Sequence, residues 1–232
     1  MHESNDTLEI HTRRTIHATT LWLHGQGASS EDLIPIFKNL TDSRALGLRY
    51  VAPNATLRRL TALGNRMGRA WYDGIAPDSD EPDPESLAET HNQLTALLDS
   101  EQHNAIPSSK IIMGGFSQGA ALALYTGLQH PHPLAGIVVL SGELLNPDDL
   151  ANRIHPANAT TPVLMIHGTE DATISLQEAE ANRDRLRAQG LPVDWHTLPL
   201  GHEISMDTIA IIDQWLLARL QEQGVAASLE DQ

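Results

Sequence analysis

The sequence predicts an α/β fold with a mainly parallel central sheet flanked by helices on both faces. Short apolar runs bounded by Gly or Pro alternate with longer segments that have helical spacing. No Pro-, Ser- or Gly-rich linker, change of composition or internal repeat divides the 232 residues. We therefore expect residues 1–232 to form one domain, with residues 1–7 and 224–232 as loose termini.

The expected strands are short apolar runs, most of which end close to a glycine, a proline or a polar turn. Helical segments separate most of them, so we expect parallel pairing within the sheet. An antiparallel edge pair is expected from residues 8–16. The strands of the main sheet are predicted at residues 20–24, 49–52, 111–116, 136–140, 163–167 and 193–198.

The expected helices have apolar residues that recur on one face. In the segment after Ser86 these residues are Leu87, Leu94, Leu97 and Leu98, which are interpreted as packing positions. The last helix repeats the pattern with residues 209, 212, 216 and 220. Helices are predicted at residues 31–40, 85–101, 118–129, 176–189 and 206–221.

The longest stretch without a predicted element covers residues 53–83. Long loops in compact domains are usually functional or disordered, and this one is too apolar to be a solvated linker. We interpret it as the wall of a substrate pocket or a partial lid. The alternative is a loop that its own hydrophobic side chains fold onto the core. Its predicted substrate-binding residues are Leu57, Leu63, Met67 and Trp71.

Composition narrows the classes of function. Lys and Arg number 15 against 30 Asp and Glu, a formal net charge of −15, which argues against nucleic acid and anionic membrane as partners. Cysteine is absent, which excludes a disulfide, a thiolate metal site and a cysteine nucleophile. No apolar stretch is long enough for stable membrane insertion, and residues 1–6 do not resemble a secretory signal. We expect a cytoplasmic protein, and a Leu-rich loop could support a homodimer.

The run Gly115-Phe116-Ser117-Gln118-Gly119 lies between a predicted strand and a predicted helix. A sharp turn at this point would expose the Ser117 hydroxyl at the end of the sheet, as a nucleophile elbow does. The glycines suit a strained turn where neighbouring backbone passes close to the serine. The alternative is an ordinary glycine-rich turn, but the strand-to-helix context favours a nucleophile.

A serine nucleophile needs a neutral base that a carboxylate orients. His202 follows the last predicted strand on a loop at its carboxyl end, where open α/β sheets build their sites. His196 lies within that strand and is interpreted as a surface residue. For the acid, Asp171 follows another strand end and is preferred, with Glu143 and Glu170 as alternatives.

An oxyanion hole would use the backbone N–H after the nucleophile, that of Gln118, and one from an earlier loop. The segment 23–27 supplies such a loop directly after a strand, and its glycines allow the Gln26 N–H to approach the substrate. The start of the helix at Gln118 adds the positive end of its dipole. His24 and His167, each before a glycine at a strand end, are interpreted as packed loop residues.

Two other functional motifs are only partly matched by the sequence. Residues 25–30 nearly match a dinucleotide-binding fingerprint, but Ser30 replaces the third glycine and no acid ends the next strand. His202 and Glu203 begin like a zinc-binding H-E-x-x-H motif, but Met206 stands at the second histidine position. We therefore expect no metal and no cofactor.

Taken together, these segments resemble the phospholipase/carboxylesterase family of α/β-hydrolases, which includes carboxylesterases and acyl-protein thioesterases. The resemblance extends from residue 21 to residue 217. It implies an α/β-hydrolase fold, a triad of Ser117, Asp171 and His202, and oxyanion-hole amides at Gln26 and Gln118. It is based on residues 23–25 with Gly27, 69–73, 114–120, 140–142, 167–168 with Asp171, and 201–205.

The predicted function is that of a serine carboxylesterase that hydrolyses short-to-medium acyl esters through an acyl-enzyme. A small-molecule ester is the expected substrate. One alternative is an acyl-protein thioesterase or lysophospholipase with the same chemistry. Another is a non-catalytic binding protein on a hydrolase fold, but that reading predicts a missing triad member and none is missing. Gln26 stands where the family usually has an apolar residue, and residues 52–56 lack a second proline, which bears on acyl-chain preference.

Overall fold

A seven-stranded sheet forms the centre of the protein in a computed structural model that describes residues 7–61, 64–76 and 81–226. The strands lie in the order β1-β3-β2-β6-β7-β8-β9, and all pair in parallel except β1, which is antiparallel to β3. The predicted fold class is confirmed. The strands are β1 (Leu8–His11), β2 (Ala18–Leu23), β3 (Leu48–Ala52), β6 (Ile111–Phe116), β7 (Gly136–Leu140), β8 (Val163–Gly168) and β9 (Val193–Leu198).

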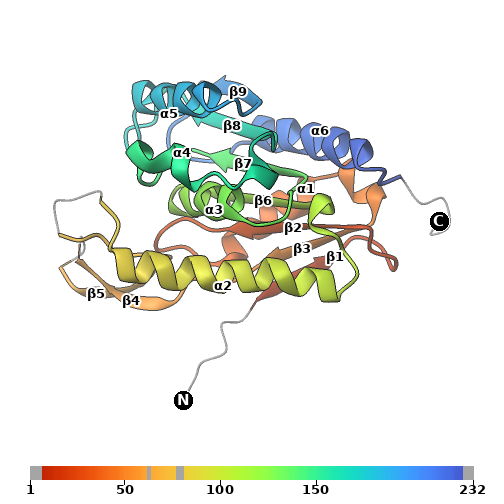
Figure 1. Cartoon of the computed structure of the whole chain (residues 1–232), viewed down its shortest axis with the longest axis horizontal. Helices are drawn as coiled ribbons and strands as arrows, with labels where there is room; N and C mark the ends of the chain where they lie inside the picture. The colour runs from red at the N-terminus through yellow and green to blue at the C-terminus, as the bar shows by residue number, and fades with distance from the viewer. Residues whose placement is uncertain (1–6, 62–63, 77–80, 227–232) are drawn as a thin grey trace, which may run out of the picture.

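Helices cover both faces of the sheet (Figure 1). On one face lie α2 (Pro84–His103), α3 (Gln118–Gln129), the short α4 (Leu150–Arg153) and α5 (Leu176–Ala188); on the other lie α1 (Ile34–Asn39) and α6 (Met206–Glu222). Successive residues of β7 alternate between the two cores: Val139 packs on the α3 side and Val138 on the α6 side. Burial on both faces explains why these strands are continuous apolar runs.

The predicted helix at residues 31–40 is wrong in its first turn. A 3₁₀ helix, η1 (Ser30–Leu33), precedes α1, and the Ser29 N–H donates to the Asp32 carboxylate at 2.8 Å. Pro35 has no N–H and cannot continue a helical ladder that starts earlier, although it fits the first turn of α1.

The edge at residues 8–16 is also simpler than expected. Instead of an antiparallel pair within this segment, the single strand β1 pairs with β3. The chain then turns at Thr12, whose N–H donates to the Leu48 carbonyl at 2.9 Å.

Residues 53–83 are not irregular throughout, because they contain a hairpin of β4 (Leu57–Leu60) and β5 (Arg66–Arg69). The hairpin projects beside the first turns of α2 at the lower left of Figure 1. Its turn includes Gly64 and Asn65, with φ of 64° and 62°.

Near the C-terminus, Val225 is packed, where a loose tail was predicted. Gly224, with φ of 73°, ends α6 in the left-handed region, as is common after helices. Val225 is then 2% exposed, and its N–H donates to the Leu220 carbonyl at 3.0 Å. The predicted loose tail is therefore wrong for residues 224–225.

Candidate active site

Ser117 occupies a strained turn between β6 and α3. Its φ of 54° and ψ of −124° lie outside the usual regions for a side-chain-bearing residue. The two flanking glycines are needed because backbone segments pass very close to them. A Cβ at Gly115 would lie 2.4 Å from the Gly119 carbonyl carbon, and a Cβ at Gly119 would lie 2.3 Å from the Leu23 carbonyl oxygen. This packing holds the serine at the carboxyl edge of the sheet.

His202 connects Ser117 to Asp171. Its Nε2 lies 2.9 Å from the Ser117 Oγ, and its Nδ1 lies 2.8 Å from Asp171 Oδ2. The ring packs against Phe116, with 4.8 Å between ring centroids. With the Nδ1 proton directed at the carboxylate, Nε2 can accept the serine proton. The structure thus brings together the three residues that the sequence predicted as a triad.

The Asp171 carboxylate is held by the backbone of its own loop. Its Oδ1 accepts the N–H groups of Thr173 at 2.8 Å and Ile174 at 3.0 Å. Burial raises the pKa of Asp171, but the bonds from Ile174, His202 and Thr173 outweigh it and hold the pKa below its usual value. Of the alternative acids, Glu170 is exposed to solvent. Asp171 is therefore the carboxylate that bonds the imidazole.

The two predicted oxyanion-hole residues lie at neighbouring strand ends, because β2 pairs in parallel with β6. Gln118 is the first residue of α3, where backbone N–H groups have no partner within the helix. Around Gln26, the Gly27 N–H donates to Arg69 O at 2.7 Å and the Ala28 N–H to Gly25 O at 3.2 Å. Within the described ranges, the Gln26 N–H has no such acceptor.

The Gln118 side chain joins the nucleophile turn to the segment before α2. Its Oε1 accepts the Trp71 N–H and its Nε2 donates to the Tyr72 carbonyl, each at 2.9 Å. Sequence reasoning missed this role because it considered only the backbone of Gln118. The two bonds hold the Trp71–Tyr72 backbone against the start of α3.

Trp71 was expected to bind substrate, but the structure places it differently. Its side chain is buried, and the indole N–H donates to the His24 carbonyl at 2.7 Å. The indole therefore supports the loop after β2 from behind instead of presenting an open apolar face. A buried indole N–H needs a partner, and this one is a backbone carbonyl. The substrate contact expected of Trp71 stays a prediction.

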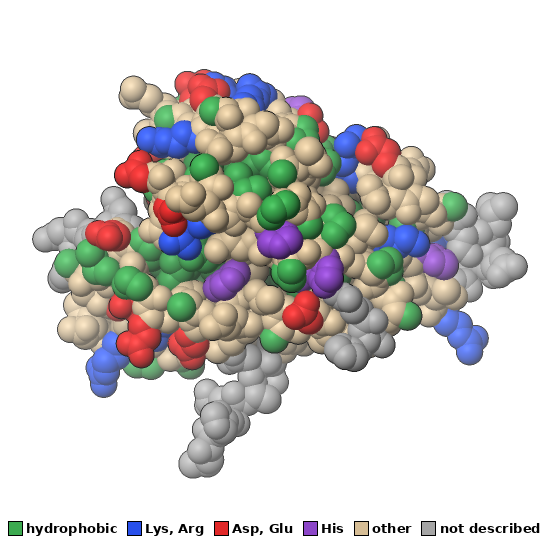
Figure 2. Space-filling model, in the orientation of Figure 1, with side chains coloured by type: hydrophobic (Ala, Val, Ile, Leu, Met, Phe, Trp, Pro, Cys, Tyr) green, Lys and Arg blue, Asp and Glu red, His purple; other side chains and the backbone are tan. Residues whose placement is uncertain are grey.

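Two of the other predicted substrate-binding residues, Leu57 and Met67, lie on the hairpin. Leu57 and Met67 are 46% and 58% exposed, and hydrophobic surface gathers beside β4 and β5 in Figure 2. Leu57 pairs with Arg69, whose carbonyl accepts the Gly27 N–H, so the base of the hairpin borders the predicted oxyanion loop of residues 23–27. Leu63 lies outside the described residues.

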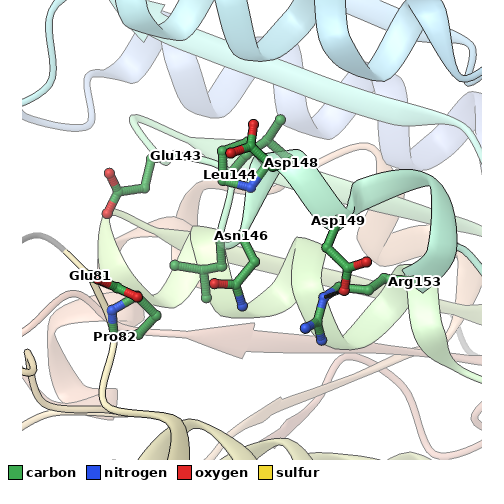
Figure 3. A pocket seen from close by; sticks show the side chains of 10 residues that line it. Glu81, Pro82, Glu143, Leu144, Asn146, Asp148, Asp149 and Arg153 are labelled. Atoms are coloured by element: carbon green, nitrogen blue, oxygen red, sulfur yellow. Dashed lines mark ion pairs between the residues drawn. The ribbon is translucent and has the colours of Figure 1, made fainter.

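A pocket of about 510 Å³ lies beyond the end of β7 (Figure 3). Leu144 and Leu145 supply apolar lining. Glu143, an alternative acid in the sequence interpretation, lines this pocket. The carboxylate that bonds His202 belongs to Asp171. Burial raises the pKa of Tyr72, and the charge of the nearby Glu143 raises it further. The remaining lining residues are Glu81, Pro82, Asn146, Pro147, Asp148, Asp149 and Arg153.

No group of three or more His, Asp or Glu that could hold a metal occurs among the residues that the structure describes. In the same part of the chain, no helix has the length and apolar character needed to cross a bilayer.

The phospholipase/carboxylesterase family matches residues 5–219. The chain belongs to this family. Acyl-protein thioesterase 1 homolog 1 of Dictyostelium discoideum is 34% identical over 208 residues, which cover 87% of this chain and 90% of the relative. Acyl-protein thioesterase 1 of Yarrowia lipolytica is 30% identical, with 88% and 93% covered. The protein is a hydrolase that acts on ester bonds, as the sequence predicted.

Solved structures show the same fold. SOBER1 of Arabidopsis thaliana superposes with a TM-score of 0.82 at 28% identity, covering 88% of this chain and 99% of that one. Acyl-protein thioesterase 2 of Zea mays gives a TM-score of 0.79 at 28% identity, with coverage of 94% and 100%. The α/β-hydrolase fold expected from the resemblance is therefore confirmed.

Proposed function

We propose that the protein is a serine esterase that forms an acyl-enzyme at Ser117. The observation that carries this proposal is the hydrogen-bonded chain from the Ser117 hydroxyl through His202 to Asp171. A strained turn presents the serine, and a buried carboxylate orients the imidazole. Ester hydrolysis through such a triad requires neither metal nor cofactor.

In the proposed mechanism, His202 removes the proton from Ser117 as the hydroxyl oxygen attacks the ester carbonyl. Asp171 stabilises the imidazolium that forms, and the N–H groups of Gln26 and Gln118 bind the oxyanion. His202 then protonates the leaving alcohol. Water attacks the acyl-enzyme in a second round that releases the acid and restores the serine.

For the substrate, we propose carboxylic esters with short-to-medium acyl chains as one candidate. The exposed Leu57 and Met67 beside the oxyanion loop support an apolar acyl group. The second candidate is the thioester of an acylated protein, and the relatives named acyl-protein thioesterases support it. A lysophospholipid ester is a further alternative with the same chemistry. The cytoplasmic location, the homodimer and the single domain stay predictions.

The test compares wild type with Ser117→Ala on p-nitrophenyl esters from acetate to palmitate and on an S-palmitoylated peptide. We expect kcat to fall by about 10⁶-fold in the variant on every substrate that the wild type cleaves. The relative kcat/KM on oxygen esters and the thioester then separates the two candidates. Equal activity of wild type and Ser117→Ala would disprove the proposal.

A further inference from the structure

His24 directly follows β2 in the predicted oxyanion loop of residues 23–27, and both of its ring nitrogens are bonded. Its Nε2 lies 3.0 Å from the Ala55 nitrogen, and its Nδ1 lies 2.7 Å from the Gly25 carbonyl oxygen. Since a backbone N–H can only donate, Nε2 must be the acceptor. The proton of the neutral ring is then on Nδ1 and is donated to the Gly25 carbonyl.

The Gly25 carbonyl and the Gln26 N–H belong to one peptide unit. This unit is planar, so any bond that fixes the direction of its oxygen also fixes the direction of its N–H. The same oxygen accepts the Ala28 N–H at 3.2 Å, which closes the loop into a turn. On these grounds we propose that His24 is a positioning residue that aims the Gln26 N–H at the substrate oxyanion.

This inference rests on the proposed function, because it assumes that the Gln26 N–H binds the oxyanion. The surroundings fix the imidazole in place. Trp71 holds the His24 backbone carbonyl at 2.7 Å, and its ring centroid lies 5.0 Å from that of the imidazole. These contacts hold the imidazole in one orientation.

The imidazole must also be neutral, since a proton on Nε2 would face the Ala55 N–H. The side chain is buried, and burial lowers the pKa of His24. The bond to Gly25 raises it, Arg69 on β5 lowers it and Asp32 on η1 raises it, with a net lowering. The neutral form with the proton on Nδ1 is thus the one that the site favours.

Two amide variants separate positioning from packing. His24→Asn places an N–H₂ group where Nδ1 stands and keeps the bond to Gly25, but it abandons the Ala55 N–H. His24→Gln places its amide near Nε2, so it can keep the Ala55 partner but loses the bond to Gly25. Each variant removes one of the two bonds, and only one of these bonds aims the oxyanion donor.

We expect His24→Gln to lower kcat on p-nitrophenyl esters by about 10- to 100-fold with KM nearly unchanged, somewhat less than the full loss of an oxyanion donor. His24→Asn should keep kcat within about threefold of wild type, although its melting temperature falls further than that of His24→Gln. If kcat instead follows melting temperature in the two variants, His24 is only a packing residue and the proposal is wrong.

A measurement without turnover separates failure of this inference from failure of the proposed function. The imidazole ¹⁵N spectrum of the full chain should show His24 protonated on Nδ1 and not on Nε2. Protonation on Nε2 overturns the inference, whatever the activity. If the tautomer is as expected but wild type cleaves no ester, the proposed function fails while the hydrogen-bond geometry of His24 stands.

Discussion

The carboxyl edge of the sheet and the β4–β5 hairpin both border the candidate site, but they are built differently. At the edge, polar groups are bonded to backbone or to one another, as in the contacts of Asp171 and Gln118. On the hairpin, Leu57 and Met67 extend into solvent. From this contrast we propose that the edge fixes the chemistry of the reaction, whereas the hairpin influences which acyl group is accepted.

Among the variants that test this comparison, Asp171→Asn is expected to have the largest effect on kcat. An amide cannot stabilise the imidazolium and favours the wrong tautomer of His202, so kcat should fall by about 10⁴-fold, as in serine proteases. Steady-state kinetics on p-nitrophenyl butyrate measures it. Glu170→Gln, which changes an exposed neighbour, is the matched control and should keep wild-type activity.

Asp171→Asn should also change how the free energy of unfolding depends on pH. Because folding lowers the pKa of Asp171, its ionised form contributes stability above the pKa of an unfolded aspartate, about 4. This contribution is lost as the pH falls through the lower folded pKa. Urea unfolding should therefore show a difference between wild type and Asp171→Asn at about pH 5 that shrinks as the pH falls below about 4. A difference that grows in this acid range would contradict this account.

A smaller effect is expected from Gln118→Glu. A carboxylate cannot donate to the Tyr72 carbonyl and would face it instead, so the contact with the Trp71–Tyr72 backbone should loosen. We expect kcat/KM to fall by about 10-fold, the equivalent of one hydrogen bond. The control is Gln129→Glu at the other end of α3, where the side chain also donates to a carbonyl, that of Tyr125. Equal losses in both variants would contradict a specific role for Gln118.

The smallest effect is expected from the double substitution Leu57→Ser and Met67→Ser. Less apolar area beside the oxyanion loop should raise KM for decanoate and longer esters by about three- to tenfold and leave acetate hydrolysis unchanged. Met206→Ser, a similarly exposed methionine on α6, serves as the control. If acetate and decanoate are affected alike, the hairpin does not select the acyl chain.

The sheet edge and the hairpin also differ in how much of each could be predicted from the sequence. The turn at Ser117 could be predicted because a Cβ at Gly115 would meet the Gly119 backbone, which is a local constraint, whereas the close contact at Gly119 is with the distant Leu23 backbone. The positions of Asp171 and His202 followed from the rule that parallel strands end at the same edge. The sequence therefore predicted where a site residue lies whenever that residue directly follows the end of a strand.

The hairpin could not be inferred in the same way. Its apolar residues have no clear period, since Leu60 is buried while Leu57 and Met67 are exposed. The bond from the Trp71 indole to a main-chain carbonyl could not be predicted, because no side-chain pattern indicates such a partner. His24 was interpreted as a packed residue; it is buried, and one of its two ring bonds also joins it to Ala55, 31 residues further along the chain.

The most direct test of the account is covalent labelling of the native chain with a p-nitrophenyl alkylphosphonate, followed by intact-mass and peptide mass spectrometry. The Ser117 oxygen should displace p-nitrophenolate from phosphorus and form a stable tetrahedral adduct. We predict one phosphonyl group per chain on Ser117 and none in Ser117→Ala. Labelling at another residue, or equal labelling of both proteins, would contradict the assignment of Ser117 as the nucleophile.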